Sequence, residues 1–345
     1  MVWYACLLTV SFPIHRANYR TLDPDWEGEV FIADIDRTYL ATQISSMKGL
    51  ARIPFESAAD KKDIAGMARL FREIRRGPQT ERRETPLYFV SASPAQLRPV
   101  IERKMMLDGI GFDGTTFKNW SAVFRRLRLK RLREQVGFKM TALLAGRAEL
   151  PTGAIENLIG DDLETDPLTF ALYADLLARR IPANDISRIL QLNGVLEGDA
   201  DAVARAIRDQ PPTEGVKRAY IRMERHDDPE YFKDFGPGVI GCHGAFQMAA
   251  VLMHEGSISL AGAVRVAEDL RQRGLPASDL VDRLRDLCRR ALLTPEETVA
   301  LAERMAENGL VERFDDPGQP DPSWEAVWQR GSERLWTPPR FLGEA

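Results

Sequence analysis

The sequence predicts an α/β protein built on a Rossmann-like parallel sheet flanked by helices. Four short, nearly continuous apolar segments occur at 29–34, 86–91, 154–160 and 216–222, and helix-like segments follow them. Continuous apolar strands that alternate with crossover helices are typical of a parallel sheet buried on both faces. Ligands bind such sheets outside the carboxyl ends of the strands, so the residues that follow the apolar segments are the first candidates for a functional site.

Helices are expected between these strands because apolar residues recur there with a period of about 3.6 residues. The first helix ends at Gly77 and Pro78, and Ser93 with Pro94 is expected to form a cap and first turn for the second. The predicted helices cover 64–75, 95–106, 139–148 and 167–178. A helical insertion of about 181–210 precedes the last strand.

The pattern becomes purely helical after about residue 256. We therefore divide the chain into a sheet domain at 1–255, with a small cap at about 38–63, and a C-terminal helical region with a tail at 256–345. A small cap favours an accessible site. The tail carries three tryptophans, and because exposed tryptophans are costly in water we expect the tail to pack back onto the protein.

Composition argues against several classes of protein. The 47 basic and 51 acidic side chains leave a formal net charge of -4, so no nucleic-acid partner is expected. Three widely spaced cysteines favour neither a disulfide framework nor a zinc site, and we expect a cytoplasmic protein. The apolar start "MVWYACLLTVSF" lacks a positive leading region, so we interpret it as a strand or packed arm. No segment approaches the roughly 18 apolar residues of a membrane helix.

Polar side chains gather where the predicted strands end. The segment "DIDRT" places two aspartates one residue apart, and an extended backbone aims both carboxylates the same way. Two like charges about 4 Å apart repel by roughly 4 kcal/mol at the effective dielectric of a protein surface, so a cation is expected beside them. Further polar residues follow along the chain, at or near the later predicted strands. The whole set comprises Asp34 and Asp36, then Ser91, then Lys139, and finally Asp161, Asp162 and Asp166.

This order of motifs is similar to the four-motif pattern of the haloacid-dehalogenase (HAD) superfamily, whose members are mostly Mg²⁺-dependent phosphatases. The segments "DIDRT", "YFVSASPAQLRPVIE", "LIGDDLETDPLTFALYA" and "KRAYIR" resemble the catalytic domain of the yeast-type phosphatidate phosphatase family linked to actin patches, and its bacterial relatives. The similarity covers roughly residues 29–255, apart from the helical insertion, and leaves the C-terminal third unexplained.

The resemblance implies a role for each acid. Asp34 matches the nucleophile that forms an aspartyl-phosphate, and Asp36 matches the acid and base that protonates the leaving oxygen and later activates water. Mg²⁺ is implied as the cofactor, with the Asp34 side chain, the Asp36 main-chain carbonyl and Asp161 as ligands. Asp162 and Asp166 would support the metal through bound waters; their alternative role is that of acids in the first turn of a helix.

The other motif residues are implied to bind the phosphoryl group. Ser91 offers its hydroxyl beside the amide of Ala92, and Lys139 neutralises the developing charge. Thr38 belongs to the same set and is expected to hold the loop by a local hydrogen bond. The rivals for the role of Lys139 are Lys118 and Lys130.

Four further features of the sequence have both a functional and a structural interpretation. Arg37 within the first motif could influence the choice of substrate. The basic segment 125–133 is either an electropositive surface for an anionic headgroup, membrane or nucleic acid, or a solvated helix face. Arg222 could bind an anion or form a structural ion pair. A metal or thiol site at Cys242 and His243 is not expected, because no second cysteine lies nearby.

These observations predict a phosphoric monoester hydrolase of the HAD type that hydrolyses an organic, possibly lipid, phosphate monoester with Mg²⁺. The expected partners are a phosphorylated small molecule or a phosphatidate-like lipid, with peripheral contact to an anionic membrane. The alternative is a catalytically weak protein of the same fold that acts as a scaffold through its C-terminal helices. A response-regulator receiver is excluded, because there the acidic pair precedes the phosphorylated aspartate, whereas here the pair follows the serine and the lysine.

Overall fold

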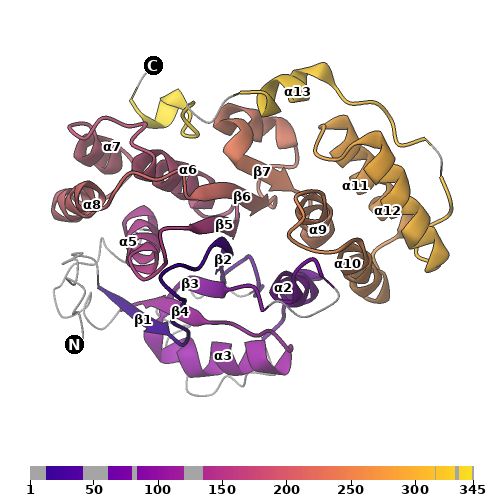
Figure 1. Cartoon of the computed structure of the whole chain (residues 1–345), viewed down its shortest axis with the longest axis horizontal. Coiled ribbons are helices and arrows are strands. Elements are labelled where there is room, and N and C mark those ends of the chain that lie inside the picture. Colours follow the sequence, from indigo (N-terminus) through magenta and orange to yellow (C-terminus); the bar gives the residue numbers. More distant parts are fainter. Residues whose placement is uncertain are drawn as a thin grey trace.

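The protein has three layers, with one central sheet between two layers of helices (Figure 1). The structure, a computed structural model, describes residues 13–41, 61–79, 84–119, 135–314, 316–330 and 334–343. The basic segment 125–133, Lys130, the first twelve residues and most of the predicted cap lie outside the described residues. The predicted α/β class with a mostly parallel sheet is confirmed.

Within the described part of the chain the sheet has seven strands in the order β1-β4-β3-β2-β5-β6-β7. Each neighbouring pair is parallel except β1 with β4. The bounds are β1 Ile14–Asn18, β2 Gly28–Asp34, β3 Leu87–Pro94, β4 Gly114–Lys118, β5 Ala154–Asp161, β6 Val216–Arg222 and β7 Val239–Cys242. The four apolar segments are therefore confirmed as β2, β3, β5 and β6.

The apolar pattern of the sequence did not predict β1, β4 and β7, because these strands are short or polar. β1 (IHRAN) is a polar edge strand, and β4 (GTTFK) lies between it and β3 with only one large apolar residue. β7 (VIGC) has four residues at the opposite edge. Short or polar strands near an edge lack the long apolar run that marks a strand buried on both faces.

The chain reverses direction across the sheet at β2. From β2 it proceeds to β3 and β4 on one side, and it then returns to β5, β6 and β7 on the other. The carboxyl ends of β2 and β5 therefore flank the point where the strand order switches, which is where open α/β sheets bind ligands. Asp34 ends β2 and Asp161 ends β5, so both aspartates lie at this point.

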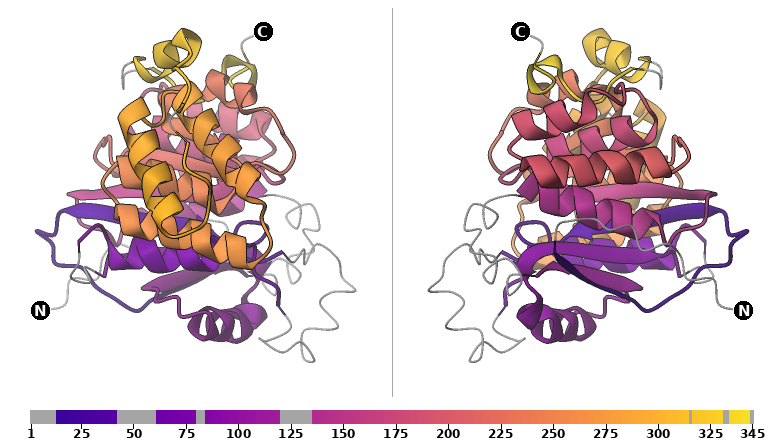
Figure 2. Two further views of the ribbon diagram at one scale, coloured as in Figure 1. Left: turned by 90° about the vertical axis from the view of Figure 1, so that its right-hand side faces the viewer. Right: turned by 90° about the vertical axis from the view of Figure 1, so that its left-hand side faces the viewer.

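The helices cover the two faces of the sheet unequally, as the two views of Figure 2 show. One face carries α5 Gln135–Arg147, α6 Asp166–Leu177, α7 Ile186–Leu192 and α8 Glu197–Asp209. The other face carries α2 Met67–Arg76, α3 Arg98–Leu107, α9 Ala245–His254, α10 Leu260–Gln272, α11 Ala277–Arg289 and α12 Pro295–Glu307. Successive strand residues point to opposite faces, so Phe31 enters the second core while Val30 and Ile32 enter the first.

The C-terminal helices α10–α12 share a hydrophobic core with the sheet. Leu284 and Leu301 belong to the same buried cluster as Phe71 of α2 and Phe89 of β3. Arg265 of α10 also donates to the buried carboxylate of Glu73 in α2. The predicted division at residue 256 therefore crosses a continuous core, and it stays a prediction about domain organisation.

The tail packs back onto the sheet domain, as its tryptophans led us to expect. Trp324 in α13 Pro322–Trp328 is buried, and Trp328 is half-buried. Trp336 is buried as well, and its amide donates to the buried Asp175 of α6 at 2.9 Å. No helix in the described part of the chain has the length and apolar character needed to cross a bilayer.

Two details of the predicted helices are wrong. Ser93 does not cap α3: it lies within β3, and a short 3-10 turn, η3 Ala95–Leu97, separates that strand from the helix. Lys139 lies inside α5 rather than at its first residue. Both errors place a polar side chain at a helix start, whereas the structure directs each one to the carboxyl ends of the strands.

Glu156 on β5 gives a stability prediction remote from these ends. The side chain is fully buried, accepts a hydrogen bond from Tyr173 at 2.8 Å and has Arg147 only at 3.8 Å. Burial raises the pKa of Glu156 from 4.5 to about 7. The folded state therefore holds this proton more tightly than the unfolded chain, and the resulting stability is present below about pH 4.5 and lost as the pH rises through about 7.

We expect Glu156→Gln to lose less stability than wild type between pH 5 and pH 8, by about 2.5 kcal/mol, because each pKa unit corresponds to about 1.4 kcal/mol. Urea unfolding at both pH values measures the difference. Glu307→Gln, at an exposed position, serves as the control and should follow wild type. Identical pH dependence in wild type and Glu156→Gln would contradict the prediction.

Candidate active site

The loop that follows β2 is fixed by its own backbone. The carbonyl of Ile35 accepts hydrogen bonds from the amides of Tyr39 and Leu40 at 3.0 and 2.9 Å. Arg37 occupies the left-handed region with φ 64°, which is uncommon for a residue with a side chain. Its carbonyl accepts two hydrogen bonds from the guanidinium of Arg222, at 2.8 and 2.5 Å. This clamp from β6 holds the tight turn that sets the positions of the two aspartates of the first motif.

The side chains of Arg37 and Arg222 are both engaged with Glu224. Arg37 Nη1 lies 3.3 Å from the Glu224 carboxylate, and Arg222 forms a second ion pair with the same residue. The structural alternative for Arg222 is therefore observed, and Arg37 also has a partner within the protein.

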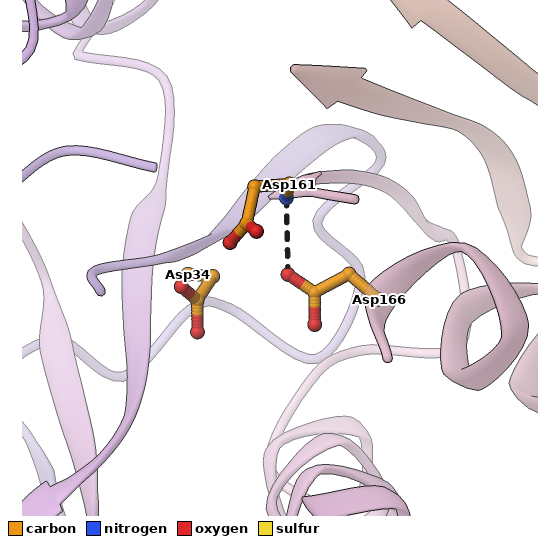
Figure 3. Close-up of side chains that lie close together, drawn as sticks. All are labelled: Asp34, Asp161 and Asp166. Atoms are coloured by element: carbon orange, nitrogen blue, oxygen red, sulfur yellow. Dashed lines mark hydrogen bonds between the residues drawn. The ribbon is translucent and has the colours of Figure 1, made fainter. Parts of the chain in front are cut away.

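Three buried aspartates meet at the switch point (Figure 3). Asp34, Asp161 and Asp166 each offer a carboxylate oxygen, and these oxygens lie within 4.8 Å of one another. The amide of Asp161 donates to Asp166 at 3.2 Å, which turns the start of α6 toward the end of β5. Gly160 makes this approach possible, because a Cβ at that position would collide with the Asp166 carboxylate.

Lys139 projects from α5 into this acidic group. Its Nζ lies 2.9 Å from Asp34 Oδ1 and 2.9 Å from Glu164 Oε2, and it also forms an ion pair with Asp166. Burial alone would lower the pKa of Lys139, but the carboxylates of Asp166, Asp34 and Glu164 outweigh burial and raise this pKa well above its usual value. The ammonium group is therefore firmly charged.

One ammonium does not balance the surrounding acids. Burial raises the pKa of Asp34 well above its usual value, and burial together with Asp166 raises that of Asp161 to about 7. Both carboxylate oxygens of Asp34 are buried and have no hydrogen bond among the described residues. Oxygen-rich, under-neutralised groups of this kind suit a hard divalent cation, so the three aspartates fit a metal site.

Asp36 lies in a separate polar cradle. Its Oδ2 accepts a hydrogen bond from Ser91 at 2.7 Å, and Ser93 donates to the same carboxylate at 2.9 Å. The Ser91 oxygen in turn accepts from the Ser93 amide at 3.0 Å. Burial raises the pKa of Asp36, and these hydroxyl hydrogen bonds oppose that increase. Two serines therefore fix the direction of this carboxylate.

Asp162 points away from the aspartate triplet. Its carboxylate accepts hydrogen bonds from the consecutive amides of 224–226 at 2.7 to 2.8 Å. The ring of His226 also contacts it, at 3.1 Å, and stacks on Tyr231. This carboxylate therefore anchors the segment after β6, the segment that supplies Glu224 to the clamp.

The remaining predicted residues are distributed around the triplet. Thr38 Oγ1 lies 3.5 Å from Asp161, across the switch point rather than within its own loop. Ala92 is half-buried between the two serines. The ammonium of Lys118 lies over the ring of Phe138, 5.7 Å from its centre. Among the lysines in the described part of the chain, Lys139 forms ion pairs with two members of the triplet, Asp34 and Asp166.

Sequence reasoning missed Ser93 and Glu164. Ser91 and Ser93 are two residues apart on one strand, so their side chains share a face, and this spacing was the available signal. Glu164 carried no such signal, because its approach to Lys139 depends on how β5 turns into α6.

Comparison with known proteins agrees with this geometry. Residues 30–190 match the family described as phosphatidate phosphatase APP1, catalytic domain. No curated protein matched the chain, and no solved structure did so either. The match begins within β2 and includes Asp34, Asp36, the two serines, Lys139 and the acids after β5. Residues 30–190 are therefore similar to the catalytic domain of the phosphatidate phosphatase APP1 family, a family of phosphoric monoester hydrolases.

Proposed function

We propose that this protein is a Mg²⁺-dependent phosphatase that hydrolyses a lipid-type phosphate monoester through an aspartyl-phosphate on Asp34. The observation that supports the proposal most directly is the state of Asp34. Its carboxylate is buried at the switch point, without a hydrogen bond of its own, beside Lys139 at 2.9 Å. A carboxylate free of hydrogen bonds keeps its oxygen lone pairs available for attack on phosphorus.

The two aspartates divide the reaction between them. An oxygen of Asp34 attacks phosphorus, and the bond from phosphorus to the leaving oxygen breaks. Asp36 gives its proton to that oxygen, and its raised pKa suits a proton donor. Water then attacks the phosphorus of the aspartyl-phosphate and gives a proton to Asp36, which releases inorganic phosphate and restores Asp34. Ser91 and Ser93 keep Asp36 in one orientation.

Mg²⁺ would be held by Asp34, Asp161 and Asp166, with the Asp36 carbonyl as the further ligand that the resemblance implies. When bound, the ion neutralises negative charge on the phosphoryl oxygens. Asp162 would act indirectly, because its carboxylate is occupied by the backbone of 224–226. Lys139 would stabilise the same charge from the α5 side.

The substrate class rests on the family, whose description names phosphatidate. The scaffold alternative has no particular observation in its favour. Helices α10–α12 direct Leu270, Leu284 and Leu301 into the core that they share with the sheet. The triplet and Lys139 are also intact.

The first prediction concerns Asp34→Asn. This change should lower kcat at least about a thousandfold on 4-nitrophenyl phosphate and on phosphatidate in mixed micelles, because it removes the nucleophile. The variant should still fold, because Lys139 keeps its ion pairs with Glu164 and Asp166, and thermal unfolding checks this. Asp25→Asn, at an exposed loop position, is the control. Retention of the full rate by Asp34→Asn would refute the mechanism.

The second prediction concerns the metal. In protein stripped with a chelator, Mg²⁺ at a hundred times its Kd should stabilise the fold by about 2.7 kcal/mol, which thermal unfolding and calorimetry measure. Asp161→Asn should weaken Mg²⁺ binding at least about tenfold. The matched control is Asp162→Asn, at the next residue, which should keep Mg²⁺ affinity near wild type because its carboxylate binds the 224–226 amides. Equal losses in both variants would count against the assigned triplet.

The third prediction separates Ser93 from a structural role. Ser93→Ala should lower kcat by about ten- to a hundredfold in wild type, and have almost no effect when Asp36→Asn is already present, because the hydroxyl acts through Asp36. The cycle is measured with 4-nitrophenyl phosphate. Ser257→Ala, at a buried serine remote from the site, should leave kcat unchanged. Additive losses in the cycle would show that Ser93 does not act through Asp36.

A further inference from the structure

A pocket lies beside the aspartate triplet, at the carboxyl ends of β6 and β7. It is a pocket of about 470 Å³, which is within the size range of small-molecule sites. Arg222, the last residue of β6, lines it and pairs across the sheet with Asp161 of β5. His243, directly after β7, forms another part of the wall. The pocket therefore opens at the same edge of the sheet as the triplet.

The walls of this pocket combine apolar and cationic groups. Ile64 before α2, Leu270 of α10 and Leu275 after α10 supply apolar surface. Arg283 of α11 and Arg273 supply positive charge. Figure 1 shows α9, α10 and α11 grouped beside the β7 edge of the sheet. A pocket of this composition suits an organic anion with an apolar chain, rather than a wholly apolar or wholly polar ligand.

The arginines differ in whether the protein already neutralises them. Arg273 pairs with Asp63 at 2.8 Å and with Asp269 at 2.9 Å. Arg222 is engaged with the Arg37 carbonyl and with Glu224, as described above.

Arg283 is the exception. Among the described residues its guanidinium has no ion pair within 4 Å and no hydrogen bond. The acid that acts on its pKa is Asp279, one turn earlier on α11. The side chain is half-buried, and this burial lowers its pKa. A guanidinium that has lost part of its hydration without gaining a partner gains most from an anionic ligand.

The spacing connects this arginine with the triplet. Arg283 Nη1 lies 3.7 Å from the place that a Cβ on Gly244 would occupy, next to the end of β7. β5 and β7 are separated only by β6, and neighbouring strands are about 4.8 Å apart, so the ends of β5 and β7 are roughly 10 Å apart. A leaving group with a chain of about six carbons covers such a distance.

We propose that this pocket binds the leaving group of the substrate, and that Arg283 pairs with a second anionic group at the far end of that leaving group. The favoured substrate is thus an organic phosphate monoester whose apolar chain ends in a carboxylate or a second phosphate. This inference rests on the proposed phosphatase function. Arg222, His243 and Arg283 all lie outside the matched residues 30–190, so these polar groups of the pocket come from the remaining part of the chain.

Three esters of equal chain length test the proposal: hexyl phosphate, 6-(phosphonooxy)hexanoate and hexane-1,6-bisphosphate. Wild type should hydrolyse at least one of the two esters that carry a second anionic group with a kcat/KM about tenfold or more above that of hexyl phosphate. Which of them is preferred distinguishes a carboxylate from a phosphate. Arg283→Met keeps the apolar stem. It should bring the three kcat/KM values to within about twofold of one another by lowering only those of the esters with a second anionic group. Arg283→Lys keeps the charge and should retain part of the preference.

Arg289→Met is the matched control on the same helix, because Arg289 is exposed and paired with Asp286. It should leave all three rates unchanged. Equal rates of wild type on the three esters, or a preference that survives Arg283→Met, would overturn the pocket assignment while the phosphatase function stands.

Binding to Asp34→Asn separates the two proposals. By calorimetry this variant should bind an ester with a second anionic group about tenfold tighter than hexyl phosphate. Asp34→Asn/Arg283→Met should not show this tenfold difference. If wild type hydrolyses neither these esters nor 4-nitrophenyl phosphate and phosphatidate, the phosphatase proposal fails, and the binding comparison alone decides whether Arg283 recognises the second anion. Equal binding of all three esters to Asp34→Asn would reject the pocket.

Discussion

A single buried ammonium group holds the acidic end of the sheet together. Lys139 reaches from α5 to Asp34 at the end of β2 and to Glu164 and Asp166 at the start of α6. Removing one partner of a buried ion pair typically costs about 3–5 kcal/mol, because the charge that remains is uncompensated. This cluster therefore fixes three elements relative to one another. Because its acids outnumber its one cation, it also requires that an entering group be positive, or carry a positive ion with it.

The strand order explains why these charges converge. The chain leaves β2 toward β3 and later returns to β5 on the opposite side, so the helices that follow the two neighbouring strands lie on opposite faces. The connections that follow β2 and β5 therefore diverge and leave a crevice between the ends of these strands. Polar side chains from both sides of the sheet can meet in this crevice. The Gly160 backbone then admits the Asp166 carboxylate. The site is thus a consequence of topology, to which particular residues add the chemistry.

Part of this arrangement could be predicted from the sequence. Asp34, Asp161 and Lys139 follow from motif order and from the rule that carboxyl ends of parallel strands share an edge. From the sequence, Ser93 is expected to cap a helix, because a serine before a proline occurs at helix starts as well as at strand ends. Only the path of β3 in the structure decides between these two positions. For a similar reason the sequence does not distinguish the role of Asp162 from that of Asp161. Adjacent aspartates look alike in a sequence, but backbone amides of 224–226, which are distant in the chain, donate hydrogen bonds to Asp162.

The clamp between Arg222 and the Arg37 carbonyl links the pocket with the aspartate triplet at this edge of the sheet. Arg222 lines the pocket and also holds the turn that positions Asp34 and Asp36, so replacing it would disturb the reacting groups and the pocket together. Arg283 has no such second duty, because it comes from α11 and contacts neither aspartate. Its position can therefore vary in charge or length without loss of the reacting groups. If the pocket binds the leaving group as proposed, selectivity for that group is most easily altered at a residue of this kind, which lines the pocket but supports neither aspartate.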